Sequence, residues 1–440
     1  MSSPQNGFQK ATLPWWRRHP GVAVAAVAFA LRLIVIFGLQ TYHFPKLETT
    51  EFAFGYETGS IAGSIARGQG FSSPFGVPTG PTAWIAPIYP YMLAGIFKLL
   101  GTYTLASAAA ILVLNSAFAA LSCAALYELG TELLGRTVGL LASWAFAVVP
   151  FFMRWPTTWA WDPPLSALLL TCLLLVAVRL RGVALPQWFA FGLLWGVTAL
   201  VNPALLSLMP LCLVYSAWRL RWRGVLPACL AFFAMLITIS PWLVRNRSAM
   251  GQWVFLRDNF GLEFSMGNFP NSPGVPFNGR HPRGNARLMQ QYKELGEVQF
   301  CRARLECTKA WVKANPGDFA RLTLKRAADF WDGEELRFEP RNEPWSPWMI
   351  ALTSAIAWAG MIALIWCQER ARFLLLGLLL IYPLPYYITY TNPRYRHAIE
   401  PEMVLMSAYL VWIAWERVRD LPSLEWLFVE LGGRTRKVLR

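Results

Sequence analysis

The stretch from residue 105 to residue 129, LASAAAILVLNSAFAALSCAALYEL, decides the class of this protein. With a rise of about 1.5 Å per residue, a helix of this length can cross a bilayer core of about 30 Å. Similar apolar runs recur along the whole chain. They predict about ten membrane spans, over residues 21–39, 105–129, 138–153, 164–178, 188–200, 205–218, 225–242, 348–366, 373–390 and 399–415.

The composition agrees with a polytopic membrane protein. Hydrophobic residues make up 55% of the 440 residues and charged residues only 15%, which is more apolar than an ordinary soluble domain. Unpaired backbone groups cannot face lipid, and the sequence shows none of the alternation typical of barrel strands. We therefore predict an all-α membrane protein.

The formal net charge of +15 has a topological explanation. Basic residues gather at the ends of apolar runs instead of along one polar face, which argues against a nucleic-acid-binding protein. The positive-inside rule places these clusters, and with them both termini, in the cytoplasm. No small-x-small cleavage site follows the first run, so we interpret it as a retained anchor. The clusters contain Arg17, Arg18, Arg179, Arg181, Arg219, Arg221, Arg223, Arg370 and Arg372.

Two segments between spans, residues 40–104 and 244–347, are too long to be simple turns and lie outside the cell in this orientation. The predicted organisation is a cytoplasmic tail (1–20), a transmembrane bundle that includes the first outer loop (21–243), an extracytoplasmic cap (244–347), further transmembrane helices (348–416) and a basic cytoplasmic tail (417–440).

The first outer segment contains two predicted helices. Ile61 and Ile65 are four residues apart and indicate a short amphipathic helix, closed by Gly68 and Gly70. A second run, over residues 90–100, is too short to cross the bilayer comfortably. We expect both helices to lie along the membrane interface.

The second outer segment predicts a small helical cap. Helical sequence covers residues 286–314 and 319–330, with NPGD as a stop between them. Cys301 and Cys307 would face the oxidising side and could pair. In one continuous helix, however, a spacing of six residues separates them by about 9 Å on diverging faces, which is beyond disulfide reach.

Three carboxylates, Glu48, Glu51 and Glu57, follow the first span. Their simplest interpretation is a solvated loop. Glu57 stands apart because FGYETGSIA places it at the start of the amphipathic helix, where it could cap the helix or point into a cleft. Asp162, in WAWDPPL, starts another span at the same membrane depth, which favours a shared site although Asp before Pro-Pro is also an ordinary helix start.

Basic residues at the outer end of the last span oppose the positive-inside bias. TNPRYRHAIEPEM contains Arg394, Tyr395, Arg396 and His397, and Arg245 ends another span on the same side. Two guanidiniums flanking a tyrosine can bind a phosphate by charge-assisted contacts. The alternative is that these arginines snorkel to lipid headgroups. Within the first span, Arg32 is too costly to face lipid and is expected to point into the bundle.

With these residues in hand, the chain resembles the GT-C superfamily of membrane glycosyltransferases, in particular protein O-mannosyltransferases and the lipid A aminoarabinose transferase. The likeness covers most of the chain. The motifs that carry it are an acidic first outer loop before IAGSIARGQGF, then PIYPYMLAGIFKLLG, Asp162, PWLVRN and RYRHAIEP, in this order.

The resemblance implies an inverting transfer of a sugar from a polyprenyl-phosphate carrier to a lipid, glycan or protein acceptor on the outer face of a membrane, which we expect to be a bacterial inner membrane. It implies that Glu57 is the general base, that Asp162 is the acid flanking the cavity and that the arginines of RYR hold the lipid phosphate. The adjacent Asp-Glu pair of the family is absent here, so Glu51 remains a rival base. WIAPIYP replaces the lysine before the double proline in the aminoarabinose branch, which argues against that sugar.

Two further questions stay open at the level of sequence. Asp162 and one glutamate are too few ligands to argue for or against a divalent metal. A transporter or flippase of a lipid-linked anionic glycan is the alternative function, although paired halves with broken helices, the usual sign of a transporter, are not evident.

Overall fold

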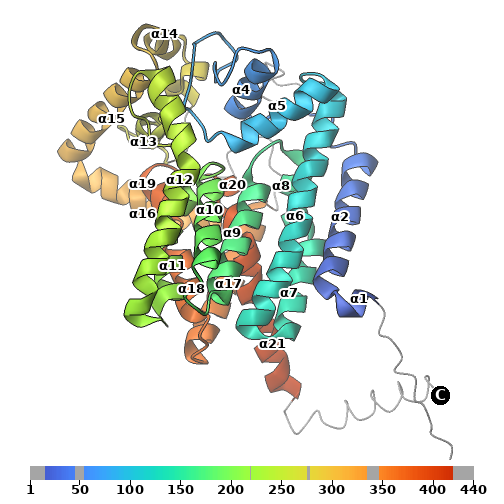
Figure 1. Cartoon of the computed structure of the whole chain (residues 1–440). Helices are drawn as coiled ribbons and strands as arrows, with labels where there is room; N and C mark the ends of the chain where they lie inside the picture. The colour runs from blue at the N-terminus through green and yellow to red at the C-terminus, as the bar shows by residue number, and fades with distance from the viewer. Residues whose placement is uncertain (1–14, 45–53, 219, 275–277, 334–345, 420–440) are drawn as a thin grey trace, which may run out of the picture.

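The computed structural model describes residues 15–44, 54–218, 220–274, 278–333 and 346–419. In these ranges no strand forms, and the extended pairing is limited to an isolated bridge between Ser72 and Pro81. The predicted all-α class is confirmed. Figure 1 shows a bundle of long helices with shorter helices gathered at one end.

Among the described residues, five helices are long and apolar enough to cross a membrane, and all five coincide with predicted spans. They mark the chain as an integral membrane protein. They are α2 (Pro20–Gly38), α6 (Leu105–Leu134), α12 (Val225–Met250), α17 (Ser346–Trp366) and α21 (Glu400–Arg419).

The other predicted spans fall on shorter or interrupted helices. One pair, α7 (Arg136–Val148) and α8 (Pro150–Thr158), bends by 53°. The rest are α9 (Pro163–Arg179), α10 (Leu185–Ala199), η1 with α11 (Pro203–Leu208, Met209–Trp218) and α18 with α19 (Arg372–Ile381, Leu384–Ile388). The number of ten spans therefore stays a prediction. Short turns complete the helices: α1 (Trp15–Arg18), η2 (Arg221–Gly224), α20 (Pro393–Arg396) and η6 (His397–Ile399).

Arg32 occupies the bend between α7 and α8. Pro150 has no N–H to donate to the carbonyl of Phe146, so that oxygen lacks its helical partner. Arg32, which is 0% exposed, donates to the carbonyls of Phe146 and Ala147 at 3.2 Å each and to that of Ala28 at 3.0 Å. The arginine thus faces the bundle interior, as expected, and stabilises a broken helix pair.

The first outer segment folds into the two predicted helices, α4 (Glu57–Ala66) and α5 (Ile88–Leu100). Gly68 and Gly70 follow α4 with φ of 79° and 73°, values that glycine adopts without strain. Their placement at a membrane interface stays a prediction. Both helices lie at the end of the bundle that also carries α13, α14 and α15 (Figure 1).

The second outer segment starts later than predicted, because α12 continues past residue 242 to Met250. The single helix predicted over residues 286–314 is wrong: Gly296, with φ of 74°, divides it. Cys301 is buried and Cys307 exposed on one helix, both as free thiols, so no bridge forms. The elements are α13 (Phe260–Gly267), η3 (Asn278–Arg280), η4 (Pro282–Gly284), α14 (Ala286–Leu295), α15 (Glu297–Ala314) and α16 (Pro316–Asp332).

A buried carboxylate joins the two outer segments. Glu297, 5% exposed, accepts hydrogen bonds from the backbone N–H of Ala83 at 2.7 Å, the hydroxyl of Tyr292 at 2.8 Å and the hydroxyl of Thr82. The N–H of Asp258 donates to the carbonyl of Ala83 at 2.9 Å. These contacts hold the loop after α4 against the cap. The loop and the cap both contribute residues to the wall of one cavity.

Candidate active site

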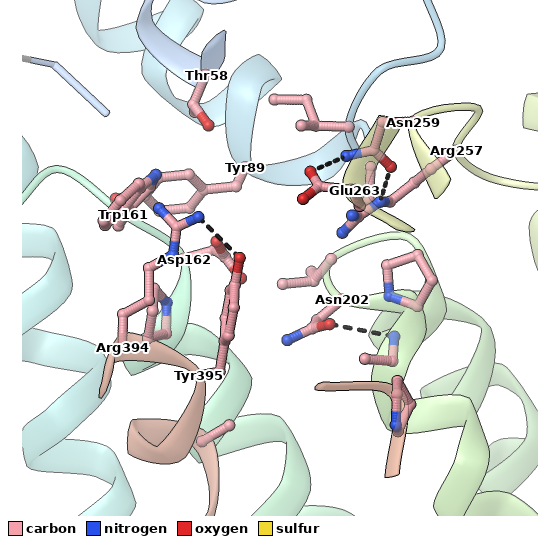
Figure 2. A pocket seen from close by; sticks show the side chains of 18 of the residues that line it. Thr58, Tyr89, Trp161, Asp162, Asn202, Arg257, Asn259, Glu263, Arg394 and Tyr395 are labelled. Carbon is pink, nitrogen blue, oxygen red and sulfur yellow. Dashed lines mark hydrogen bonds between the residues drawn. The ribbon is translucent and has the colours of Figure 1, made fainter. Parts of the chain in front are cut away.

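A cavity of about 360 Å³ lies between the bundle and the two outer segments. Figure 2 shows its polar side chains pointing toward one another from separate elements. Of the predicted site residues, Glu57, Asp162, Arg394 and Tyr395 all line it. Segments far apart in the sequence therefore bring two carboxylates and a guanidinium into one space.

Glu57 is presented by a tight turn at the start of α4. Gly55 has φ of 90°, and a Cβ there would lie 2.2 Å from the carbonyl oxygen of Ala160, so only glycine fits. The next residue, Tyr56, also has a positive φ of 56°. This turn brings the start of α4 close to the chain that leads into α9.

The Glu57 carboxylate is paired with a histidine of the cap. Its Oε1 lies 3.3 Å from Nε2 of His281. Nδ1 of His281 accepts from the backbone N–H of Arg283 at 3.2 Å, so Nε2 carries the proton and donates to Glu57. Burial favours a higher pKa for Glu57, but this hydrogen bond and the charge of Arg394 outweigh it and hold the pKa below its ordinary value.

Asp162 stands before α9, yet its side chain caps no backbone N–H of that helix. It accepts from the Ser166 hydroxyl at 3.0 Å instead, and the amide of Asn202 donates to the same hydroxyl oxygen at 3.3 Å. Burial raises the pKa of Asp162, against the lowering effect of Ser166 and Arg394. The Asp162 carboxylate thus lines the cavity while Ser166 holds it in place.

Arg394 is held by aromatic side chains. Its guanidinium carbon lies 3.6 Å from the ring centroid of Trp161, and Nη2 donates to the Tyr395 hydroxyl at 3.0 Å (Figure 2). Trp161 is stacked in turn on Tyr56 and Trp159, with centroids 5.1 and 5.4 Å away. The stack orients the guanidinium plane through cation–π contact.

Arg396 and His397 do not line the cavity, contrary to the expected phosphate clamp. Residues 393–396 are helical, and positions two apart on a helix differ by about 200° in direction. Arg396 is therefore buried in the bundle, where it meets the Thr353 hydroxyl at 2.7 Å and Glu400 at 3.4 Å. His397 contacts Glu400 through Nδ1 at 2.7 Å.

Arg245 also lies outside the cavity lining, and its contacts are structural. It donates to the carbonyls of Thr82 at 2.6 Å and Phe71 at 2.7 Å, with Trp242 4.8 Å from its guanidinium carbon. It fastens the first outer segment to α12. Glu51, the rival base, lies outside the described residues.

Sequence reasoning missed a second polar wall of the cavity. Arg257 donates to Asn259 at 3.0 Å, and Asn259 donates to Glu263 at 2.7 Å (Figure 2). These residues lie in RDNFGLE, shortly after PWLVRN on the outer side. The density of charged residues in this short stretch was the sequence feature that could have indicated a site. The tyrosines at positions 382, 386 and 390 were missed too, although their spacing of four residues is visible in the sequence.

Among the described residues, no group of three or more His, Cys, Asp or Glu side chains is arranged to hold a metal ion. The cavity brings carboxylates and guanidiniums together, and these groups suit proton transfer and binding of an anion.

Comparisons with known proteins agree with this architecture. Residues 84–244 match the family model of dolichyl-phosphate-mannose-protein mannosyltransferase. The archaeal oligosaccharyltransferase AglB from Archaeoglobus fulgidus, in complex with an inhibitory peptide and a dolichol-phosphate, aligns with a TM-score of 0.52 at 14% identity, over 94% of this chain and 52% of its own. The same organism's enzyme tethered to an acceptor peptide gives 0.53 at 14% identity, over 92% of this chain and 51% of its own.

ArnT from Cupriavidus metallidurans, bound to undecaprenyl phosphate, aligns with a TM-score of 0.43 at 13% identity, over 91% of this chain and 78% of its own. No curated protein matches the sequence. The chain spans about half the length of the oligosaccharyltransferase structures. The chain is thus an integral membrane protein with the fold of the GT-C superfamily of membrane glycosyltransferases.

Proposed function

We propose that this protein is an inverting glycosyltransferase that takes a sugar from a polyprenyl-phosphate carrier. The observation that carries the proposal is the shared cavity: Glu57, Asp162 and Arg394 line one space at the end of the bundle. A lipid-linked donor needs such a place, because its tail stays in lipid while its phosphate and sugar enter a polar pocket.

The proposed reaction uses Glu57 as the proton acceptor. The acceptor hydroxyl is a poor nucleophile, and a positioned carboxylate that removes its proton is worth about 10²- to 10⁴-fold in rate. The lowered pKa keeps Glu57 ionised and ready to accept. As the new bond from acceptor oxygen to the anomeric carbon forms, the bond from that carbon to the phosphate oxygen breaks, and the polyprenyl phosphate leaves.

The leaving phosphate gains negative charge, and guanidiniums in a poorly hydrated cavity stabilise it. Arg394 supplies one such group, and Arg257 on the opposite wall supplies a second. Asp162 keeps its predicted role as the second acid of the cavity, positioned beside Arg394. The family match and the dolichol-phosphate named with the archaeal structure support a donor of this class.

We further propose that the cavity faces the extracytoplasmic side of a bacterial inner membrane, with both termini in the cytoplasm. The basic clusters at the opposite ends of the apolar runs support this orientation. The acceptor belongs to the broad class of lipid, glycan or protein carrying a hydroxyl, an amine or a phosphate.

The proposal is tested with purified protein and a radiolabelled polyprenyl-phosphate sugar. We expect acceptor labelling coupled to release of free polyprenyl phosphate, reduced at least about 100-fold in Glu57→Gln and in Arg394→Ala. Arg321→Ala is the matched control, since Arg321 is an exposed cap residue paired only locally with Asp318.

Two outcomes contradict the proposal. Movement of the intact carrier across the membrane without cleavage would make the protein a transporter of lipid-linked anions. Equal labelling by the native chain and both cavity variants would mean that the cavity does not perform the transfer.

A further inference from the structure

A belt of polar side chains runs around the cavity from one arginine to the other. Its first arm starts at Arg394, whose Nη2 lies 3.0 Å from the Tyr395 hydroxyl. The Tyr395 hydroxyl donates to that of Tyr390 at 3.2 Å, and the Tyr390 hydroxyl lies near the Glu263 carboxylate, whose charge acts on it. Two tyrosines thus connect Arg394 to Glu263.

The second arm starts at Arg257 on the opposite wall. Nε of Arg257 donates to Oδ1 of Asn259 at 3.0 Å, and Nδ2 of Asn259 donates to Oε1 of Glu263 at 2.7 Å (Figure 2). Asn259 stands at the N-cap of α13, where asparagine usually binds a backbone N–H, but its side chain makes no such bond. It is 3% exposed and bridges the two charged side chains instead.

The direction of every bond in the belt is fixed by its ends. Each guanidinium can only donate and a carboxylate can only accept. Each tyrosine has one proton, so Tyr395 donates onward to Tyr390, and the Tyr390 proton is left to point toward Glu263. Both arms therefore run from an arginine toward Glu263, which accepts the last hydrogen bond of the Asn259 arm and attracts the Tyr390 proton at the end of the other.

We propose that Glu263 is a positioning residue that sets both guanidiniums against the phosphate of the lipid-linked substrate, a role that rests on the proposed function. Each arginine uses one N–H on the belt and keeps the others for the cavity. With Trp161 stacked on Arg394, the belt leaves that guanidinium little freedom to turn. Two preset cations bind one phosphate without the cost of ordering them at the moment of binding.

The test measures binding of polyprenyl phosphate without a sugar, in detergent, so that it does not depend on turnover. Glutamine keeps the size of Glu263, but its amide group donates, so one arm must break or reverse. We expect Glu263→Gln to weaken binding about tenfold, the range of a lost charge-assisted hydrogen bond, while Glu263→Asp retains more affinity. Glu294→Gln, on the exposed face of α14, is the matched control.

A double-mutant cycle separates positioning from a merely structural role. Tyr395→Phe removes the hydroxyl that links Arg394 to the belt, so Glu263→Gln should cost less in that background than in the native chain. In the transfer assay, Glu263→Gln should chiefly raise KM for the donor and change kcat less.

Unchanged binding in Glu263→Gln, or strictly additive losses with Tyr395→Phe, would overturn the inference while leaving the proposed function intact. If the native chain does not bind polyprenyl phosphate at all, both fall. If the native chain binds but transfers no sugar, and the cycle is non-additive, the positioning role stands and the transferase proposal fails.

Discussion

Asp162 illustrates how a functional residue can lower stability. Its carboxylate is partly buried, and burial raises its pKa above the ordinary value. A raised native pKa stabilises the fold below the unfolded pKa, and this contribution is lost as the pH rises through the native pKa. The ionised form of Asp162 therefore works against folding, although it faces the cavity where chemistry is proposed.

We expect Asp162→Asn to raise the thermal midpoint at pH 8 while it lowers transfer at least about tenfold. The gain in stability should shrink as the pH falls, because the raised pKa keeps the native carboxyl protonated to a higher pH than the unfolded one. Thermal unfolding in detergent at pH 8 and at lower pH values checks this, with exposed Asp318→Asn as the control. A lower midpoint for Asp162→Asn at pH 8 would contradict the argument.

Asp258 gives a second pH dependence, in the joint between the outer segments. Burial and the nearby Glu297 raise its pKa to about 7, against the charge of Arg302. Its Oδ2 has no hydrogen-bond partner among the described residues. The stabilising, protonated form is lost as the pH rises through about 7.

Native protein should accordingly lose stability relative to Asp258→Asn as the pH rises from about 4 to about 7, by at most about 1.4 kcal/mol per pH unit, and the difference should level off above pH 7. Unfolding midpoints across this range provide the measurement. A constant difference between the two proteins over the range would refute the shift.

At the scale of helices, close packing in the bundle depends on small residues. Gly192 of α10 faces α12, and a Cβ there would lie 2.1 Å from the carbonyl oxygen of Ala231. Small residues let membrane helices approach closely and pack through their backbones. The α10–α12 pair therefore needs glycine at this position.

We expect Gly192→Ala to destabilise the protein by about 1 to 3 kcal/mol, because the helices must separate. Gly95→Ala is the control, since nothing lies within 4 Å of a Cβ at that helical position of α5. Its effect should be neutral or favourable, as alanine is the better helix former. Thermal midpoints of the two variants compare them directly, and equal midpoints would count against tight packing.

Helix existence was predictable because apolar runs and turn residues act locally. Each predicted span falls on helical residues, and α4 starts at Glu57 as FGYETGSIA indicated. Breaks were harder: Gly296 divides the predicted cap helix, and α7 and α8 bend where Pro150 removes a donor. The bend is tolerated because Arg32 supplies the missing donors, and that compensation comes from another helix.

For the whole molecule, orientation in the membrane is the remaining prediction. Cys307 on α15 and Cys367 after α17 are both exposed. Helix α15 lies at the end of the bundle that carries the shorter outer helices (Figure 1), whereas Cys367 directly precedes the basic cluster of Arg370 and Arg372, which is predicted to be cytoplasmic. If the cap is extracytoplasmic, a membrane-impermeant maleimide should label Cys307 in intact cells and Cys367 only after permeabilisation.

The variants Cys307→Ser and Cys367→Ser show which cysteine the maleimide has labelled. Labelling of intact cells should disappear in the first and persist in the second. Cys229 is exposed too, but it lies within α12, where lipid should shield it from an aqueous reagent. Persistent labelling of intact Cys307→Ser cells would contradict the proposed orientation.

The sequence by itself determined the membrane class, the helices and the residue types suited to a phosphate-linked sugar, because hydropathy and turn chemistry depend on neighbours along the chain. Only the tertiary structure decided which charged residues meet. Glu57, Asp162 and Arg394 line one cavity, whereas Arg396 turns into the bundle because its helix directs it about 200° away from Arg394. Arg257 and Glu263 join the cavity from the cap through contacts between segments distant in sequence, which no local pattern records.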